Sequence, residues 1–128
     1  MNTILIIDDE EKIRSLLARI LKGEGYTVQE AGDGKSGLQK LTKSETDVVL
    51  CDVKLPDCTG LDLVERIKAA NPVCEVILLT AYGTIKDSVL AIKNGAYNYL
   101  VKGDDNDRII PVVHNALEKV KLQKRILA

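Results

Sequence analysis

The sequence predicts an α/β fold in which a parallel five-stranded sheet of order 2-1-3-4-5 carries helices on both faces. Apolar runs that suit buried strands alternate with segments whose apolar residues recur at helical spacing. Short connections join them, and this (βα)5 alternation is typical of a parallel sheet covered on both faces. Some runs are continuous and others amphipathic, which assigns the former to the middle of the sheet and the latter to its edges.

The first part of the chain predicts two strands and two helices. Residues 3–7 (TILII) are a continuous apolar run, as in a strand buried on both faces. Apolar residues then recur at helical spacing until the glycines of residues 22–26 (KGEGY) end the helix. Residues 26–31 (YTVQEA) alternate as in a half-buried edge strand, and residues 33–44 (DGKSGLQKLTKS) predict a short helix.

The middle of the chain predicts two more central strands. Residues 47–52 (DVVLCD) and 75–81 (EVILLTA) are continuous apolar runs. Between them, residues 55–60 (LPDCTG) predict a loop, and residues 61–72 (LDLVERIKAANP) a helix stopped by the Asn-Pro pair.

The last part of the chain predicts a helix, an edge strand and a long final helix. Residues 84–95 (TIKDSVLAIKNG) form a helical segment closed by glycine, and residues 96–102 (AYNYLVK) are an amphipathic strand. The core-facing stripe predicted for the final helix consists of Ile109, Val113, Ala116, Leu117 and Val120. With the two amphipathic strands at the edges and right-handed crossovers, the arrangement is flavodoxin-like.

Composition excludes several classes of function. A chain of 128 residues fits one domain, and a net charge of −1 provides no global field for nucleic-acid or membrane binding. Trp and Phe are absent, which argues against base stacking, and no apolar run has the length of a membrane span. The odd number of cysteines, at no metal-ligand spacing, indicates reduced thiols. We therefore expect a cytoplasmic protein.

Five polar residues follow strands at the same edge of the predicted sheet. Asp8 and Asp9 follow the first strand, and Asp52, Thr80 and Lys102 end the third, fourth and fifth. Open α/β sheets bind ligands at the carboxyl ends of their strands, where the strand order reverses. We therefore expect these side chains to converge on one crevice.

The convergence of carboxylates has two plausible solutions. At roughly 5 Å, each pair repels by roughly 3 kcal/mol at an effective dielectric near 20. One carboxyl can remain protonated, or a divalent cation can bind, and an oxygen-only ligand set suits Mg²⁺ with a phosphate completing its shell. In the second case Asp52 is the expected nucleophile, forming an aspartyl-phosphate, with Asp8 and Asp9 holding the metal. Lys102 and Thr80 then contact phosphoryl oxygens.

Two further acids follow the metal-binding pair. Glu10 and Glu11 are expected in the first turn of the next helix, where negative side chains favour the helix dipole by ~0.3–1 kcal/mol each. This predicts a lesser, local role for both.

Four motifs resemble the receiver domain of two-component response regulators. They are DDE, DVKLPDCTG, LLTAYG and GAYNYLVK, and the similarity covers residues 2–120 in the family's order and spacing. We therefore expect a receiver domain in residues 1–120, with residues 121–128 as the end of the last helix or the start of a linker.

The resemblance implies specific roles. Asp52 would accept a phosphoryl group from a sensor histidine kinase or a phosphotransfer protein, and the main-chain carbonyl of Lys54 would join Asp8, Asp9 and Asp52 as a Mg²⁺ ligand. Thr80 and Tyr99 would form the switch that remodels the face made by the fourth helix, fifth strand and fifth helix. Lys54 and Tyr82 would flank the attack path and tune the lifetime of the aspartyl-phosphate, although Lys54 also fits a solvated loop lysine and Tyr99 an edge aromatic that covers core.

Residues 85–102 most resemble receivers of nitrogen-regulation-type transcription activators, in which an ATPase domain and a DNA-binding domain follow. In the final helix Leu122, Ile126 and Leu127 leave the core stripe, so this end either pairs with a second copy on activation, leads into another domain, or is a solvated end. The basic residues there do not by themselves argue for DNA binding.

The segment after Lys102 departs from the family pattern. The family usually has Pro there through a cis bond, whereas this chain has Gly103, for which a cis bond costs ~2.5–4 kcal/mol. We expect a trans bond, with Asp104 and Asp105 either capping the next helix or competing for Lys102. Pro111 predicts a kink or a late helix start near residue 110.

Other classes fit less well. A degenerate receiver that binds proteins without phosphate is the main alternative, supported only by the departure at Gly103. A turnover phosphatase with an Asp nucleophile usually needs a substrate-covering cap, and a flavin site needs a phosphate loop where this chain has acids. The expected chemistry is therefore self-phosphorylation from a phosphodonor and slow Mg²⁺-dependent autodephosphorylation, with no free substrate turned over.

Overall fold

The computed structural model describes residues 2–127. Residue 1 of the predicted range 1–120 and residue 128 of the predicted range 121–128 therefore lie outside the described residues. In chain order the elements are β1 (Thr3–Ile7), α1 (Glu11–Gly23), β2 (Thr27–Ala31), α2 (Gly34–Lys43), β3 (Val48–Asp52), α3 (Gly60–Ala70), β4 (Glu75–Thr80), α4 (Ile85–Lys93), β5 (Asn98–Val101), a 3-10 turn (Asn106–Arg108) and α5 (Ile109–Leu127).

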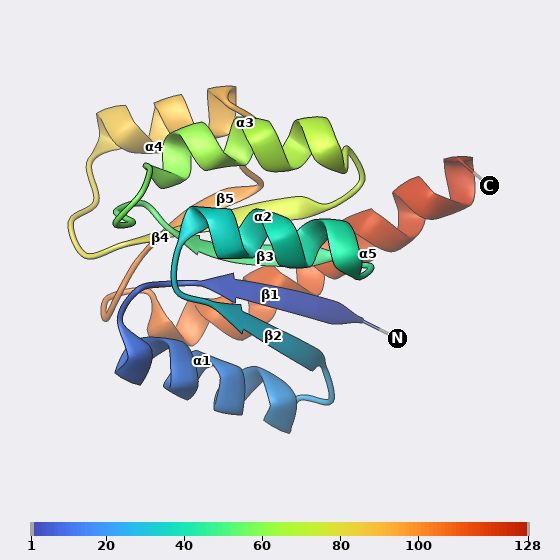
Figure 1. Ribbon diagram of the computed structural model, residues 1–128, viewed down its shortest axis with the longest axis horizontal. Coiled ribbons are helices and arrows are strands. Elements are labelled where there is room, and N and C mark those ends of the chain that lie inside the picture. The colour runs from blue at the N-terminus through green and yellow to red at the C-terminus, as the bar shows by residue number, and fades with distance from the viewer. Residues whose placement is uncertain (1, 128) are drawn as a thin grey trace.

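The sheet confirms the predicted topology. Its five strands pair in parallel in the order β2-β1-β3-β4-β5. Helices α2, α3 and α4 cover one face, and α1 and α5 cover the other (Figure 1). The register pairs Asp52 with Leu79 and Thr80 with Val101. The carboxyl ends of β3, β4 and β5 are therefore level, at the edge of the sheet where the polar residues were expected.

Alternate residues of the strands face the two helix layers. On β1, Ile4 and Ile6 pack with α1 and α5, whereas Leu5 and Ile7 pack with α2, α3 and α4. All four are fully buried, and full burial of such a side chain contributes roughly 1.5–3 kcal/mol. This two-sided burial explains why the central strands are continuous apolar runs rather than alternating ones.

Local sequence signals define the helix ends. Asp33, Thr59 and Thr84 cap α2, α3 and α4 by accepting a backbone N–H through a side-chain oxygen. Gly95 follows α4 with φ of +107°, a conformation that glycine adopts without the steric cost of a Cβ. Asn94 and Gly95 thus turn the chain directly into β5.

The start of α5 confirms the late start predicted from Pro111. The 3-10 turn ends at Arg108 and α5 begins at Ile109, which places Pro111 in the first turn. A first-turn N–H has no partner within the helix, so the missing N–H of proline costs no helical bond there. Within residues 2–127 every peptide bond is trans, including that before Gly103, which has φ of +87°.

The buried face of α5 matches the predicted stripe with Val112 added. Leu122, Ile126 and Leu127 are 57, 72 and 69 % exposed, so they do leave the docking face. A search of the described residues finds no helix with the length and hydropathy needed to cross a membrane.

Candidate phosphoacceptor site

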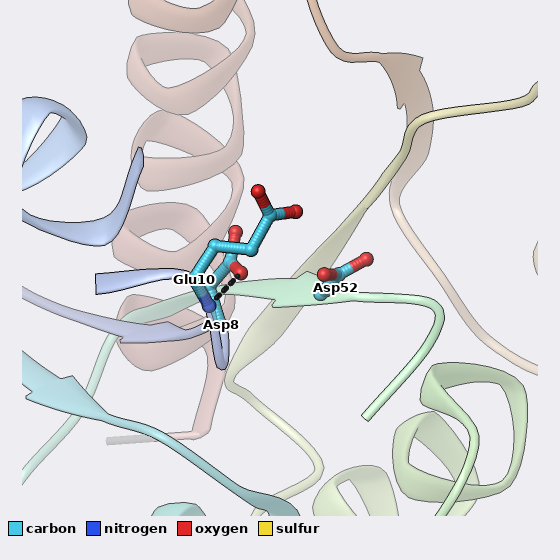
Figure 2. A group of neighbouring side chains, drawn as sticks. All are labelled: Asp8, Glu10 and Asp52. Carbon is cyan, nitrogen blue, oxygen red and sulfur yellow. Dashed lines mark hydrogen bonds between the residues drawn. The ribbon is translucent and has the colours of Figure 1, made fainter. Parts of the chain in front are cut away.

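The site begins at Asp8, directly after β1. Its side chain is 1 % exposed, and its Oδ1 accepts the backbone N–H of Glu10 at 2.9 Å (Figure 2). Arg14 donates to the Asp8 carbonyl at 2.9 Å and pairs with Glu30 at 3.2 Å. The turn between β1 and α1 is therefore fixed from both sides, and it holds the Asp8 carboxylate at the carboxyl edge of the sheet.

Asp52 is the last residue of β3 and is 6 % exposed. Its Oδ1 accepts the backbone N–H of Lys54 at 3.3 Å, and its Oδ2 accepts the Lys102 ammonium at 3.0 Å. The backbone leaves the strand tightly, because a Cβ at Gly60 would lie 2.5 Å from the Asp52 carbonyl oxygen. A glycine at the start of α3 therefore permits the close approach of this helix to the site residue.

Lys102 connects β5 to the carboxylates of β1 and β3. Its backbone N–H donates to the Thr80 carbonyl at 2.7 Å, which continues the pairing of β5 with β4 beyond the strand. From there its ammonium reaches Asp8 Oδ2 at 2.9 Å as well as Asp52, and Glu10 at 3.6 Å. The glycine that follows Lys102 does not prevent this reach, and the role of the lysine in the chemistry stays a prediction.

The pKa values of the two partners reflect this arrangement. Burial raises the pKa of Asp52, and the bonds from Lys102 oppose that effect without cancelling it. Burial of Lys102 by itself lowers the pKa of its ammonium, but the hydrogen bonds to Asp8 and Asp52 prevail and raise it. The Lys102 ammonium therefore compensates part of the negative charge of the two buried carboxylates.

Thr80 and Tyr99 occupy different environments. The Thr80 hydroxyl donates to the Tyr82 carbonyl at 3.2 Å and accepts the Tyr82 N–H at 3.3 Å. Thr80 also lines the pocket beside Asp52. Tyr99 is buried among the core residues between the sheet and α4, and its hydroxyl oxygen has no hydrogen-bond partner among the described residues. The predicted switch residues therefore lie on neighbouring strands, with only Thr80 at the pocket.

The pocket gathers most of the predicted site. It is open to solvent and is lined by Asp9, Glu10, Asp52, Lys54, Leu55, Pro56, Thr80, Ala81, Tyr82 and Lys102. Tyr82 is 87 % exposed at its rim. Asp9 faces the same space but is exposed, whereas Asp8 lies beneath it.

Glu10 differs from the expectation that it has only a local role. It lies one residue before α1, and its carboxylate turns back toward Lys102. Oxygens of Asp8, Glu10 and Asp52 lie within 4.8 Å of one another, as the carboxylates in Figure 2 illustrate. Glu10 was expected in the first turn of the helix but is the residue before it, and the direction of its side chain reflects the contact with Lys102, which is distant in the chain.

The acidic cluster fits a hard divalent cation. All its ligand atoms are carboxylate oxygens, the donor type that Mg²⁺ prefers. Asp8 Oδ2 is buried and lies 2.9 Å from the Lys102 ammonium, its ion partner.

The loop after Lys102 is ordered by Asp105 rather than by a proline. Asp105 Oδ2 accepts the Val101 N–H at 2.7 Å, and Oδ1 pairs with Arg108 at 3.4 Å. Asn106 accepts the Gly103 N–H at 3.0 Å. Asp105 therefore takes neither expected role, because it makes no side-chain cap on the 3-10 turn that leads into α5 and binds the backbone at the end of β5 instead of pairing with Lys102.

Comparison with known proteins identifies the family to which these features belong. The family described as "Response regulator receiver domain" matches residues 4–114. Regulators of the NtrX and ZraR type are among the curated relatives. The transcriptional regulatory protein ZraR of Escherichia coli K12 is 36 % identical over 114 residues, which cover 89 % of this chain and 26 % of that protein.

Solved structures give the same result. The beryllofluoride-activated NtrC4 receiver domain dimer superposes with a TM-score of 0.88 at 34 % identity, covering 94 % of this chain and 99 % of that one. The response regulator TrrA of Thermotoga maritima, in complex with Mg²⁺ and beryllofluoride, superposes with a TM-score of 0.83 at 32 % identity, covering 91 % of this chain and all of that one, 100 %.

Proposed function

The chain belongs to the response regulator receiver domain family, and from this premise we propose that Asp52 accepts a phosphoryl group from a sensor histidine kinase and thereby switches the domain. The observation that carries the proposal is the position of Lys102, whose ammonium lies 2.9 Å from Asp8 and 3.0 Å from Asp52. Lys102, at the end of the fifth strand, bridges Asp8 and Asp52 at the ends of the first and third strands. Its positive charge can also bind an anion, such as a phosphoryl group, in this otherwise acidic pocket.

Asp52, Lys102 and Thr80 have separate roles in the proposed phosphoryl transfer. An Asp52 carboxylate oxygen attacks phosphorus, the new O–P bond forms, and the bond to the donor breaks with its electrons leaving on the donor. Lys102 then exchanges a carboxylate partner for a phosphoryl oxygen. Thr80, at the end of β4, donates its hydroxyl to another oxygen after releasing the Tyr82 carbonyl.

A divalent cation, which we propose to be Mg²⁺, supplies charge neutralisation between the acids and the phosphoryl group. The residues that would hold it are Asp8, Asp9, Asp52 and the main-chain carbonyl of Lys54. TrrA was solved with Mg²⁺ and beryllofluoride, which supports the choice of metal. Glu10 adds a carboxylate at 57 % exposure and can bind a metal-bound water.

The switch proposal concerns the face made by α4, β5 and α5. Withdrawal of the Thr80 hydroxyl frees the Tyr82 backbone, which begins the loop over Val101 and Tyr99. That loop lies close, because a Cβ at Gly83 would clash with the Val101 side chain. Tyr99 is already buried, and its hydroxyl has no partner among the described residues, so a rearrangement of this loop that gives the hydroxyl a partner lowers the free energy.

The output of the switch is inferred from the relatives. The chain spans about a quarter of the length of the curated relatives it matches, 26 % for ZraR. We propose a transcriptional output through an ATPase domain and a DNA-binding domain in the same protein, in the cytoplasm. The NtrC4 receiver forms a dimer when activated, which supports a homodimer on activation as part of the proposal.

The competing degenerate receiver had one argument in its favour, Gly103. Lys102 contacts both carboxylates despite that glycine, which supports the phosphorylatable alternative.

The test is incubation with Mg²⁺ and acetyl phosphate, followed by intact-mass measurement. The proposal predicts one phosphoryl group per wild-type chain, none on Asp52→Asn, and normal labelling of the control Asp104→Asn, an exposed acid outside the pocket. Equal labelling of wild type and Asp52→Asn would reject Asp52 as the acceptor, and an unlabelled wild type would favour the degenerate receiver.

A further inference from the structure

Asp57 joins two segments that are far apart in the chain. It lies in the loop between β3 and α3, and its two carboxylate oxygens accept the backbone N–H groups of Gly34 and Lys35, each at 2.9 Å. Those two residues are the first of α2. One side chain therefore ties the loop that leaves Asp52 to the amino end of a neighbouring helix.

Asp57 shares the capping of α2 with Asp33, the residue directly before the helix. We call the two hydrogen bonds of Asp57 to Gly34 and Lys35 the tie. Asp33 accepts the Ser36 N–H at 2.7 Å through its side chain and the Gly37 N–H at 3.1 Å through its carbonyl. Asp57 takes the two N–H groups that remain in the first turn. Its pKa is lowered because the Gly34 and Lys35 N–H groups stabilise the anion, so the contact is between a carboxylate and a helix dipole.

A second contact supports the tie. A Cβ on Gly34 would clash with the Cys58 sulfur, the neighbour of Asp57. The absence of a side chain at Gly34 therefore allows the loop to pack directly on the helix backbone. Asp57 and Cys58 together fix the outer end of the loop against α2.

The inner end of the loop is the part nearest the site. Lys54 donates its N–H to Asp52 and forms an isolated bridge with Thr59. Leu55 N–H donates to the Cys58 carbonyl at 3.2 Å, which closes the turn between them. Because residues 54–59 form one closed turn, a restraint at Asp57 also restrains the main chain of Lys54.

We propose that Asp57 is a positioning residue that holds the Lys54 main-chain carbonyl ready for the divalent cation, an inference that rests on the proposed function. With the tie present, the loop is already ordered in the metal-free fold. The binding free energy of the cation is therefore not reduced by the conformational entropy that a flexible loop would lose on ordering. The coupling is reciprocal, so a bound cation must in turn strengthen the contacts of Asp57 with Gly34 and Lys35.

The first test compares Asp57→Ala with Asp33→Ala by calorimetric Mg²⁺ titration. Both variants remove a cap from the same helix and one negative charge, but only Asp57 is attached to the β3–α3 loop. We expect Asp57→Ala to weaken Mg²⁺ binding roughly fivefold or more, and Asp33→Ala to weaken it by less than about twofold. Asp57→Asn keeps one acceptor oxygen, so its Mg²⁺ affinity should lie between wild type and Asp57→Ala.

The second test reads the tie directly, by amide hydrogen exchange at Gly34 and Lys35. Mg²⁺ should slow exchange of both amides in the wild type and leave them unchanged in Asp57→Ala. Equal Mg²⁺ affinities of Asp57→Ala, Asp57→Asn and Asp33→Ala would overturn the positioning role while leaving the proposed function intact. A wild type that binds no Mg²⁺ would overturn the proposed function, and the positioning role with it.

Discussion

Lys102 Nζ lies 3.0 Å from Asp52 Oδ2, so a cation from β5 contacts the last residue of β3 across the end of β4. The same ammonium lies 2.9 Å from Asp8 Oδ2, and both carboxylates are nearly inaccessible to solvent. One lysine therefore balances two buried acids and the more exposed Glu10. The metal-free pocket keeps an excess of negative charge, and this excess has consequences for stability as well as for chemistry.

Asp52→Asn should stabilise the metal-free protein. The pKa of Asp52 is raised above its ordinary value of 3.8, chiefly by burial, so over the pH range between the two values the folded state binds more protons than the unfolded one. Stability is then lost as pH rises through the folded pKa, and the ionised carboxylate destabilises the fold at neutral pH. We expect the variant to gain about 0.5–2 kcal/mol in urea unfolding at pH 7 with EDTA.

The control is Asp104→Asn, which makes the same charge change on an exposed residue outside the pocket. Its free energy of unfolding should remain within about 0.5 kcal/mol of the wild type. A loss of stability in Asp52→Asn larger than in the control would show that the Lys102 pair outweighs burial.

Substitutions of Lys54 and Tyr82 should change the lifetime of the aspartyl-phosphate more than the phosphorylation yield. Both residues line the pocket in front of Asp52, and Tyr82 is 87 % exposed at its rim, so both can affect the approach of water. Lys54→Ala and Tyr82→Ala can be labelled with acetyl phosphate, freed of donor, and followed by intact mass. Identical decay rates in the wild type and both variants would contradict this role.

Tyr99→Phe should leave stability unchanged or raise it by up to about 1 kcal/mol. The Tyr99 hydroxyl oxygen is buried without a hydrogen-bond partner among the described residues, and an unsatisfied buried group costs roughly 1–3 kcal/mol. Tyr97→Phe, at a partly exposed ring, is the matched control and should be neutral. Thermal unfolding checks both. A clear loss in Tyr99→Phe alone would mean that the hydroxyl has a partner, such as a buried water.

Lys124→Met should destabilise the fold by about 1–2 kcal/mol, because it leaves the buried Asp47 without its cation. Lys124 contacts Asp47 at 2.7 Å and Glu45 at 2.9 Å, and its hydrogen bonds to both raise its pKa. This stabilisation is complete below the ordinary pKa of 10.5 and is lost as pH rises through the folded value.

The control for that prediction is Lys121→Met. Lys121 pairs with Glu118 at 3.6 Å on the exposed side of the same helix, so its loss should cost less than about 0.5 kcal/mol. Urea unfolding at pH 7 compares the two. Equal losses would indicate that helix propensity, rather than the contact with Asp47, accounts for both.

The sheet could be predicted because burial on both faces leaves a direct trace in the sequence. Residues 3–7 and 47–52 are continuously apolar since both sides of those strands pack against helices. The positions of Asp52 and Thr80 followed from the same reasoning, because a strand end is a property of the local chain. Asp9 lines the pocket, and its role as a metal ligand stays a prediction.

The parts that could not be predicted depend on side chains that meet across the fold. Glu10 was expected to serve its own helix, but Lys102 draws its carboxylate into the site. Asp57 caps α2 through a loop that follows it in the chain, and its sequence context, a Pro-Asp turn, carries no signal for that contact. In both cases the partner is set by tertiary packing between segments that are far apart in the chain.

Calorimetric titration of the protein with Mg²⁺ is the decisive experiment, because phosphorylation and switching as proposed both depend on an acidic pocket that accepts a divalent cation. We expect one Mg²⁺ site in the wild type and in Asp104→Asn, and strongly weakened binding in Asp9→Asn and Asp52→Asn. Binding that is absent in the wild type, or that persists unchanged in both pocket variants, would contradict this expectation.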